Sequence, residues 1–137
     1  MLDTKYEWNF DVDGSTEGWV HNTSYISGAT VANGVLTLAC DRSQEGKYLP
    51  EISIDNLNLK ASDYRGFVVR VKYTNCHLIS SKISMKFISK ETYSGSTKEV
   101  TGKLLGDAIS NYPDFADYYF NLNGNSNWVN TITKLQL

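Results

Sequence analysis

The chain has 137 residues, of which 41% are hydrophobic and 20% are charged, and its formal net charge is -2 at pH 7. The scattered basic residues give no electrostatic footprint for nucleic acid, and no apolar run approaches the roughly 20 residues of a membrane-spanning helix. A length in the commonest range for compact domains predicts a core that needs no metal or disulfide. We expect residues 1–137 to form a single module excised from a larger protein, since the start carries no signal peptide and the chain stops inside a predicted strand.

The first half of the chain predicts a strand, a polar turn and a hairpin. Trp8 alternates with Phe10 in a first predicted strand over residues 7–11. A polar turn then carries Glu17-Gly18-Trp19. Asn33-Gly34 is the strongest turn signal, because a type I′ turn requires positive φ at both central residues. It should join a strand near residues 29–32 to one at 35–41.

The second half alternates between apolar and polar residues in several short runs. Residues 67–73, 83–87 and 118–122 each place aromatic or aliphatic side chains on one face, and a last strand ends at Leu137. Glycine and proline punctuate these runs, and the only helical candidate is a single turn over residues 104–110. The sequence therefore predicts an all-β fold, a two-sheet antiparallel β-sandwich of the jelly-roll type.

The order of these segments is similar to that of a known family. Glu7-Trp8-Asn9-Phe10-Asp11, Glu17-Gly18-Trp19 and residues 33–38, 57–64, 68–72 and 128–137 together resemble the jelly-roll carbohydrate-binding modules. These belong to the galactose-binding-like β-sandwich superfamily and occur beside bacterial glycoside hydrolases and in surface-layer and phage adhesion proteins. The resemblance implies an extracellular or cell-surface protein, a polysaccharide or glycan partner, and fused catalytic or surface-anchoring domains.

A first candidate site is the outward face of the alternating strands, which corresponds to the concave-sheet site of the resembling modules. Its leading residues are Arg70, Lys86, Tyr119 and Gln136. The complete outward set also includes Lys72, Ser84, Asn121 and Lys134. Hydrogen-bonding groups around an aromatic ring suit a sugar, because the ring offers a platform for the apolar face of a pyranose. The alternative is an ordinary solvated face, since strand parity does not reveal which sheet each strand joins.

A second candidate site is a cluster of loop tips, the other usual ligand site of the resembling modules. Trp19 and Trp128 are its carbohydrate-binding candidates. His21, Tyr25, Asn111 and Tyr112 are their possible neighbours. An exposed loop tryptophan tends to mark a contact surface. The alternative is that both indoles cover the ends of the core. Trp8, in the first predicted strand, is expected to be a core residue.

The resemblance also implies a structural Ca²⁺ between the first and last strands. Its candidate ligands are Glu7, Asn9 and Asp11, because Ca²⁺ takes oxygen ligands. The matching carboxylate of the last strand is absent, since the chain ends at Gln136-Leu137. Two cysteines, Cys40 and Cys76, either form a disulfide or act as small buried hydrophobic residues, and their spacing does not decide between these.

No catalytic motif is present. His21 and His77 lie in no arrangement with a nucleophile, and there is no nucleophile elbow, zinc-protease helix motif or phosphate-binding glycine loop. The hypothesis is a non-catalytic carbohydrate-binding module that tethers an attached enzyme or surface protein to a glycan. The main alternative is a structural or protein-interaction sandwich without a sugar site. A small sugar-active enzyme is a third class, which would need two carboxylates about 5–10 Å apart in one cleft.

Overall fold

The structure, a computed structural model, describes residues 6–22, 26–40, 51–72, 82–108 and 115–137. Its strands form antiparallel sheets, which confirms the predicted all-β, sandwich-like fold. Contacts between Cα atoms divide the chain into two compact units, Met1–Asn56 with Gln136, and Leu57–Leu135 with Leu137. None of the helices in the described ranges is long and apolar enough to cross a membrane.

The first unit contains two small antiparallel pairings. Strand β1 (Val20–His21) pairs with β4 (Ile52–Ile54), and β2 (Ile26–Ala32) pairs with β3 (Val35–Cys40). Asn33 and Gly34 join β2 to β3 with φ values of 54° and 75°. Both central residues thus have the positive φ of the expected tight turn, and the predicted hairpin is confirmed.

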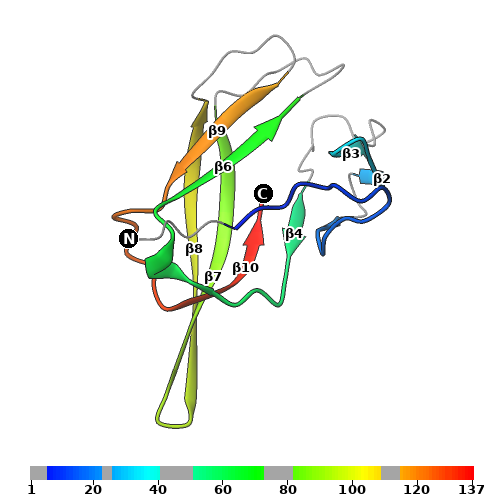
Figure 1. The fold of residues 1–137 in the computed structure, drawn as a ribbon. Helices are drawn as coiled ribbons and strands as arrows, with labels where there is room; N and C mark the ends of the chain where they lie inside the picture. The colour runs from blue at the N-terminus through cyan, green and yellow to red at the C-terminus, as the bar shows by residue number, and fades with distance from the viewer. Residues whose placement is uncertain (1–5, 23–25, 41–50, 73–81, 109–114) are drawn as a thin grey trace. The chain divides into compact units, whose positions relative to one another are not determined.

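The main strands of the second unit are neighbours in the order β10-β7-β8-β9-β6. Figure 1 shows the long β7–β8 hairpin and the shorter β6 and β9 that cross beside it. The strands are β6 (Gly66–Val71), β7 (Lys82–Tyr93), β8 (Ser96–Ala108), β9 (Ala116–Asn121) and β10 (Thr131–Gln136). Short β5 (Leu59–Lys60) pairs with β10 and leads into the 3₁₀ turn η1 (Ala61–Asp63).

The inward face of this sheet forms the core of the second unit, as the alternation of the sequence predicts. Met85 and Phe87 of β7 and Tyr118 and Phe120 of β9 are each at most 1% exposed. The intervening residues of β7 and β9 that are fully described are exposed or half-buried. Because side chains in a strand point alternately to opposite faces, this burial fixes which residues lie on the solvent face.

Residues 7–11 do not form the predicted first strand. Phe10 has a φ of 54°, and its N–H donates to a Glu17 carboxylate oxygen at 2.7 Å instead of to a neighbouring strand. The half-buried Trp8 packs edge-on against Trp19, with ring centroids 5.3 Å apart. The local carboxylate therefore competes successfully with sheet pairing, and the segment is a loop.

The predicted helical turn over residues 104–110 is also wrong, because Leu104 to Ala108 lie in β8. The remainder of that prediction, residues 109 and 110, lies outside the described residues. Five residues named in the sequence analysis also lie outside the described residues: Tyr25, Cys76, His77, Asn111 and Tyr112. The proposed pairing of Cys40 with Cys76 stays open.

Candidate functional site

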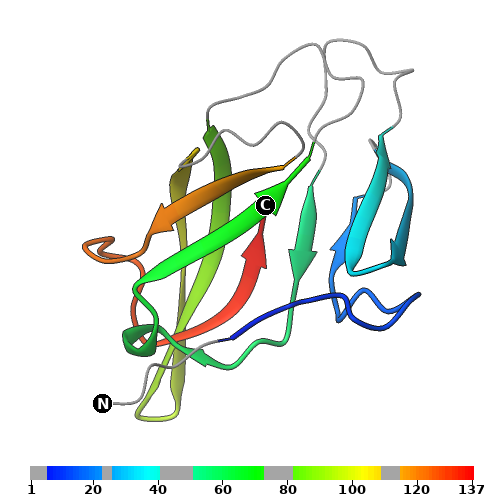
Figure 2. The same cartoon turned by 45° about the horizontal axis from the view of Figure 1, so that its top comes forward.

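The strand register gathers the outward residues of four neighbouring strands on one surface. Figures 1 and 2 show β7, β8, β9 and β6 side by side. Directly opposed residues share a face, and the register pairs Lys86 with Lys103, Asp107 with Tyr119, and Arg70 with Asp117. We call this surface the outer face. It consists of Val68, Arg70, Ser84, Lys86, Lys103, Leu105, Asp107, Asp117, Tyr119 and Asn121.

Tyr119 is the exposed aromatic residue of the outer face, with 37% of its surface accessible. Its ring leans over Gly66 of the adjacent strand. A Cβ atom at Gly66 would lie 2.7 Å from Tyr119 Cε2 and 2.9 Å from the phenol oxygen. The absence of a side chain at Gly66 therefore leaves the space into which the ring settles. One side of the ring rests on the sheet, and the exposed remainder is available to a ligand.

Arg70 and Asp117 form an ion pair beside this ring. Arg70 Nε donates to Asp117 Oδ1 at 2.7 Å and Nη2 donates to Oδ2 at 3.1 Å, which is the bidentate geometry that suits a guanidinium and a carboxylate. The hydrogen bonds from Arg70, and secondarily its charge, hold the pKa of the Asp117 carboxyl below its ordinary value of 3.8. Both groups are consequently charged at neutral pH.

The ion pair gives the stability a small dependence on pH at the acid end. The lowered pKa of Asp117 means that its contribution is fully present above pH 3.8 and is lost as the pH falls through the lower pKa of the folded state. We expect Asp117→Asn to lower the urea midpoint slightly at pH 7, and we expect the difference from wild type to shrink below pH 3.8. Urea titrations of both proteins across that range check this, and a difference that grows on acidification would contradict it.

Aliphatic and basic residues complete the outer face. Val68 is 55% exposed and Leu105 is 57% exposed, on either side of the β9 strand. Lys86 and Lys103 are exposed and directly opposed across β7 and β8. Gln136, by contrast, is half-buried at the end of β10 and belongs to the first unit. The structure thus brings together three of the four leading residues of the predicted groove.

The Trp128 side chain packs within the second unit and is not exposed at a loop tip. Its indole N–H donates to the carbonyl oxygens of Ala61 at 3.0 Å and Tyr64 at 3.2 Å. Its ring meets Phe87 edge-on, with centroids 5.0 Å apart. The half-buried indole therefore ties the η1 turn to the core, which is the alternative that the sequence left open for Trp128.

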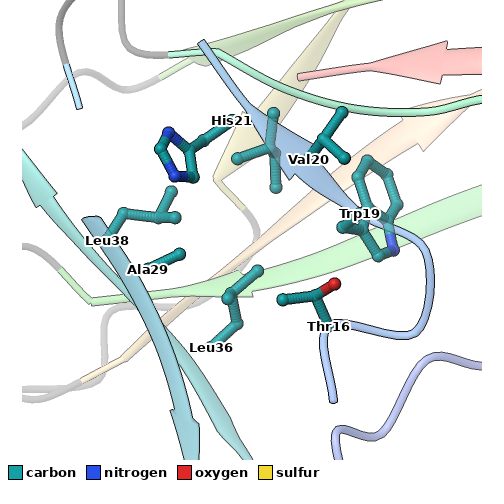
Figure 3. Close-up of a pocket in the computed structure, with 8 residues that line it drawn as sticks. Thr16, Trp19, Val20, His21, Ala29, Leu36 and Leu38 are labelled. Carbon is teal, nitrogen blue, oxygen red and sulfur yellow. The ribbon is translucent and has the colours of Figure 1, made fainter. Parts of the chain in front are cut away.

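Trp19 is 5% exposed and does not offer its ring to solvent either. It lines a small pocket in the first unit with Thr16, Val20, His21, Ala29, Leu36, Leu38 and Ile52 (Figure 3). The cavity of about 10 Å³ has room for about one water molecule. A sugar ring does not fit there. The Trp19 Nε1 atom has no hydrogen-bond partner among the described residues, and His21 Nδ1 lies 2.9 Å from the Asn22 carbonyl oxygen.

The calcium candidates Glu7, Asn9 and Asp11 are all exposed, and the strand expected to carry them is a loop. Across the described ranges, no group of three or more histidine, cysteine, aspartate or glutamate side chains is placed to hold a metal ion. Calcium binding by Glu7, Asn9 and Asp11 stays a prediction.

Sequence reasoning missed the contribution of β8 to the outer face. Leu105 and Asp107 come from the segment for which a helical turn was expected, and Lys103 directly precedes that segment. The sequence does not single out Asp117, which the register places directly opposite Arg70. Gly102 and Gly106, spaced by four residues in β8, were the available signal, because glycines inside a strand often mark a close approach.

Comparisons with known proteins identify no relative: no family model, no curated protein and no solved structure matches the chain.

Proposed function

We propose that this protein is a non-catalytic carbohydrate-binding module that holds an attached enzyme or surface protein on a polysaccharide or surface glycan. The observation that carries the proposal is the exposed Tyr119 ring, which lies over Gly66 in the middle of a face of charged, amide and hydroxyl groups. The location would accordingly be extracellular or at the cell surface.

Binding would combine stacking with hydrogen bonds. The free side of the Tyr119 ring provides a flat apolar surface for the C–H face of a pyranose. The Asn121 amide and the Arg70–Asp117 pair lie on the same face, and they supply donors and acceptors for sugar hydroxyls. The ion pair also holds the Arg70 side chain in place, which reduces the entropy lost on binding. Single-module affinity should be weak, roughly millimolar to micromolar, and tethering would act by raising local concentration.

Removing the ring of Tyr119 is the direct test. We expect Tyr119→Ala to abolish retention in affinity electrophoresis on a polysaccharide that retains the wild type, because the stacking surface is lost. Tyr119→Phe keeps the ring and should keep most of the retention. Tyr6, a 50% exposed tyrosine of the first unit, provides the matched control, and Tyr6→Ala should bind as the wild type does.

Two results would count against the proposal. The first is the absence of wild-type retention on every member of a broad polysaccharide panel. The second is equal retention of wild type and Tyr119→Ala on a polysaccharide that does bind, because the outer face would then be uninvolved.

A structural or protein-interaction spacer is the second candidate, and the environments of two indoles favour it. Trp19 is buried and Trp128 is hydrogen-bonded within the second unit, so neither is displayed as a sugar platform. The exposed Val68 and Leu105 would also suit a protein partner. A spacer should bind no glycan, and Tyr119→Ala should leave all its properties except stability unchanged.

A sugar-active enzyme receives less support. Asp107 and Asp117 share the outer face at a diagonal separation of roughly 7–8 Å between Cα positions. A glycosidase needs one such carboxyl to remain protonated as the general acid. Arg70 instead holds the Asp117 carboxyl in its ionised form by lowering its pKa. This arrangement supports a binding role for the pair.

A further inference from the structure

Two exposed lysines of the β7–β8 ladder lie directly opposite each other, although the fold does not require like charges there. Lys86 and Lys103 are directly opposed in the register, and both point to the outer face. Like charges placed directly across an antiparallel pair repel each other and destabilise the sheet. Within the described ranges, neither lysine has an ion-pair partner.

The other charged residues of the surroundings do have counterparts. Arg70 is paired with Asp117, and the Lys72 ammonium lies 5.7 Å from the centroid of the Phe115 ring. Asp107 also has an interaction partner. Among the fully described residues of the outer face, Lys86 and Lys103 are therefore the basic side chains without an ion-pair partner.

The backbone beneath the lysines is well fixed. Both residues lie inside the twelve-pair ladder of β7 and β8, whose register runs without interruption from Lys82 to Tyr93. The Lys103 carbonyl oxygen also accepts a hydrogen bond from the Asn125 amide at 3.3 Å. Two ammonium groups on a rigid sheet can approach the same anionic group from both sides, and that group would relieve their repulsion.

We infer that Lys86 and Lys103 together bind an anionic group of the glycan, a carboxylate or a sulfate ester, so that the ligand is an acidic polysaccharide. This inference rests on the proposed function. Lys103 lies four residues along β8 from Asp107, which is opposite Tyr119, so the Cα atoms of Lys103 and Tyr119 are about 14 Å apart. An oligosaccharide that stacks on Tyr119 would thus reach the lysines with a later sugar unit.

The test compares polysaccharides that differ only in charge. Wild type and Lys86→Gln/Lys103→Gln are titrated with a polyuronate and its methyl-esterified form, and with dextran sulfate and dextran. We expect the wild type to prefer the anionic member of at least one pair, with an affinity that falls as salt is raised. The double variant should bind that member at least about tenfold more weakly, since hydrogen bonds to charged groups are lost. Which pair responds distinguishes a carboxylate from a sulfate.

Lys98→Gln is the matched control, because this exposed lysine of the same hairpin stands opposite Glu91 and should be dispensable. Urea midpoints check folding, and the double variant should be as stable as the wild type or more so, since the repulsion is removed. Two results would overturn this inference: equal binding of the charged and uncharged polysaccharides, or unchanged binding by the double variant. If the wild type still binds a glycan, either result leaves the proposed function standing. Failure to bind any glycan overturns both. Tighter binding of a single-stranded oligonucleotide than of any glycan overturns the inference in favour of a nucleic-acid site.

Discussion

Gly106→Ala should destabilise the protein by about 2–3 kcal/mol, because the core of the second unit has no space for one more methyl group at this position. A Cβ atom at Gly106 would lie 2.6 Å from Cζ and 2.7 Å from Cε2 of Phe120, closer than real Cβ atoms come to a ring. Phe120 is fully buried and cannot swing into solvent. Urea or thermal unfolding monitored by circular dichroism measures the loss, which corresponds to a fall in Tm of roughly 5–15 °C.

The matched control is Gly28→Ala in β2. A Cβ atom at Gly28 would meet nothing within 4 Å, and its φ is not in the left-handed region. Alanine there should be neutral or slightly stabilising, because it restricts the unfolded chain. Phe120→Leu combined with Gly106→Ala should recover part of the loss, since a smaller side chain opposite the new methyl relieves the overlap. Equal stability of Gly106→Ala and wild type would show that the Phe120 ring does not lie over this glycine.

The close contact between Gly106 and the Phe120 ring also explains why β8 was harder to predict from the sequence than the other strands. Strands β6, β7 and β9 have apolar or aromatic residues at alternating positions on the inward face, so period 2 revealed both their existence and their faces. Strand β8 offers glycine on the inward face at positions 102 and 106, where the apolar signal should be, because aromatic rings of β7 and β9 occupy that space. The alternation of residues within one strand does not show that an aromatic ring from a neighbouring strand fills the space above a glycine.

At residues 7–11 the sequence predicts a strand that the structure does not contain. Its alternation of Trp8 and Phe10 is typical of a strand, yet Glu17 captures the Phe10 amide and Trp19 covers Trp8. Both partners come from the following turn, which the sequence identifies only as polar.

The candidate site was predictable to the extent that it lies on the alternating strands: Arg70, Lys86 and Tyr119 share a face. Asp117 and Lys103 lie opposite Arg70 and Lys86, and these neighbours could not be predicted because they depend on the strand register, which the local sequence does not encode.

Trp128→Ala should destabilise the second unit strongly, with a loss of about 3–5 kcal/mol. The change removes the edge-on contact with Phe87 and leaves a cavity beside a ring that is 1% exposed. It also deprives the carbonyl oxygens of Ala61 and Tyr64 of their indole donor. Trp128→Phe keeps an aromatic ring but removes the donor, so it should cost less, about 1–3 kcal/mol.

The Phe variant separates a structural indole from a sugar-binding one, because it folds while lacking the N–H group. If Trp128 acts only by joining η1 to the core, then Trp128→Phe lowers the urea midpoint but retains glycan affinity at temperatures well below its Tm. If the indole contacts sugar, affinity falls even where the variant is fully folded. Because both indole hydrogen bonds end on backbone oxygens of the second unit, the first outcome is the one we expect. Measuring affinity and stability on the same samples then leaves Tyr119 as the aromatic residue on which the binding proposal depends.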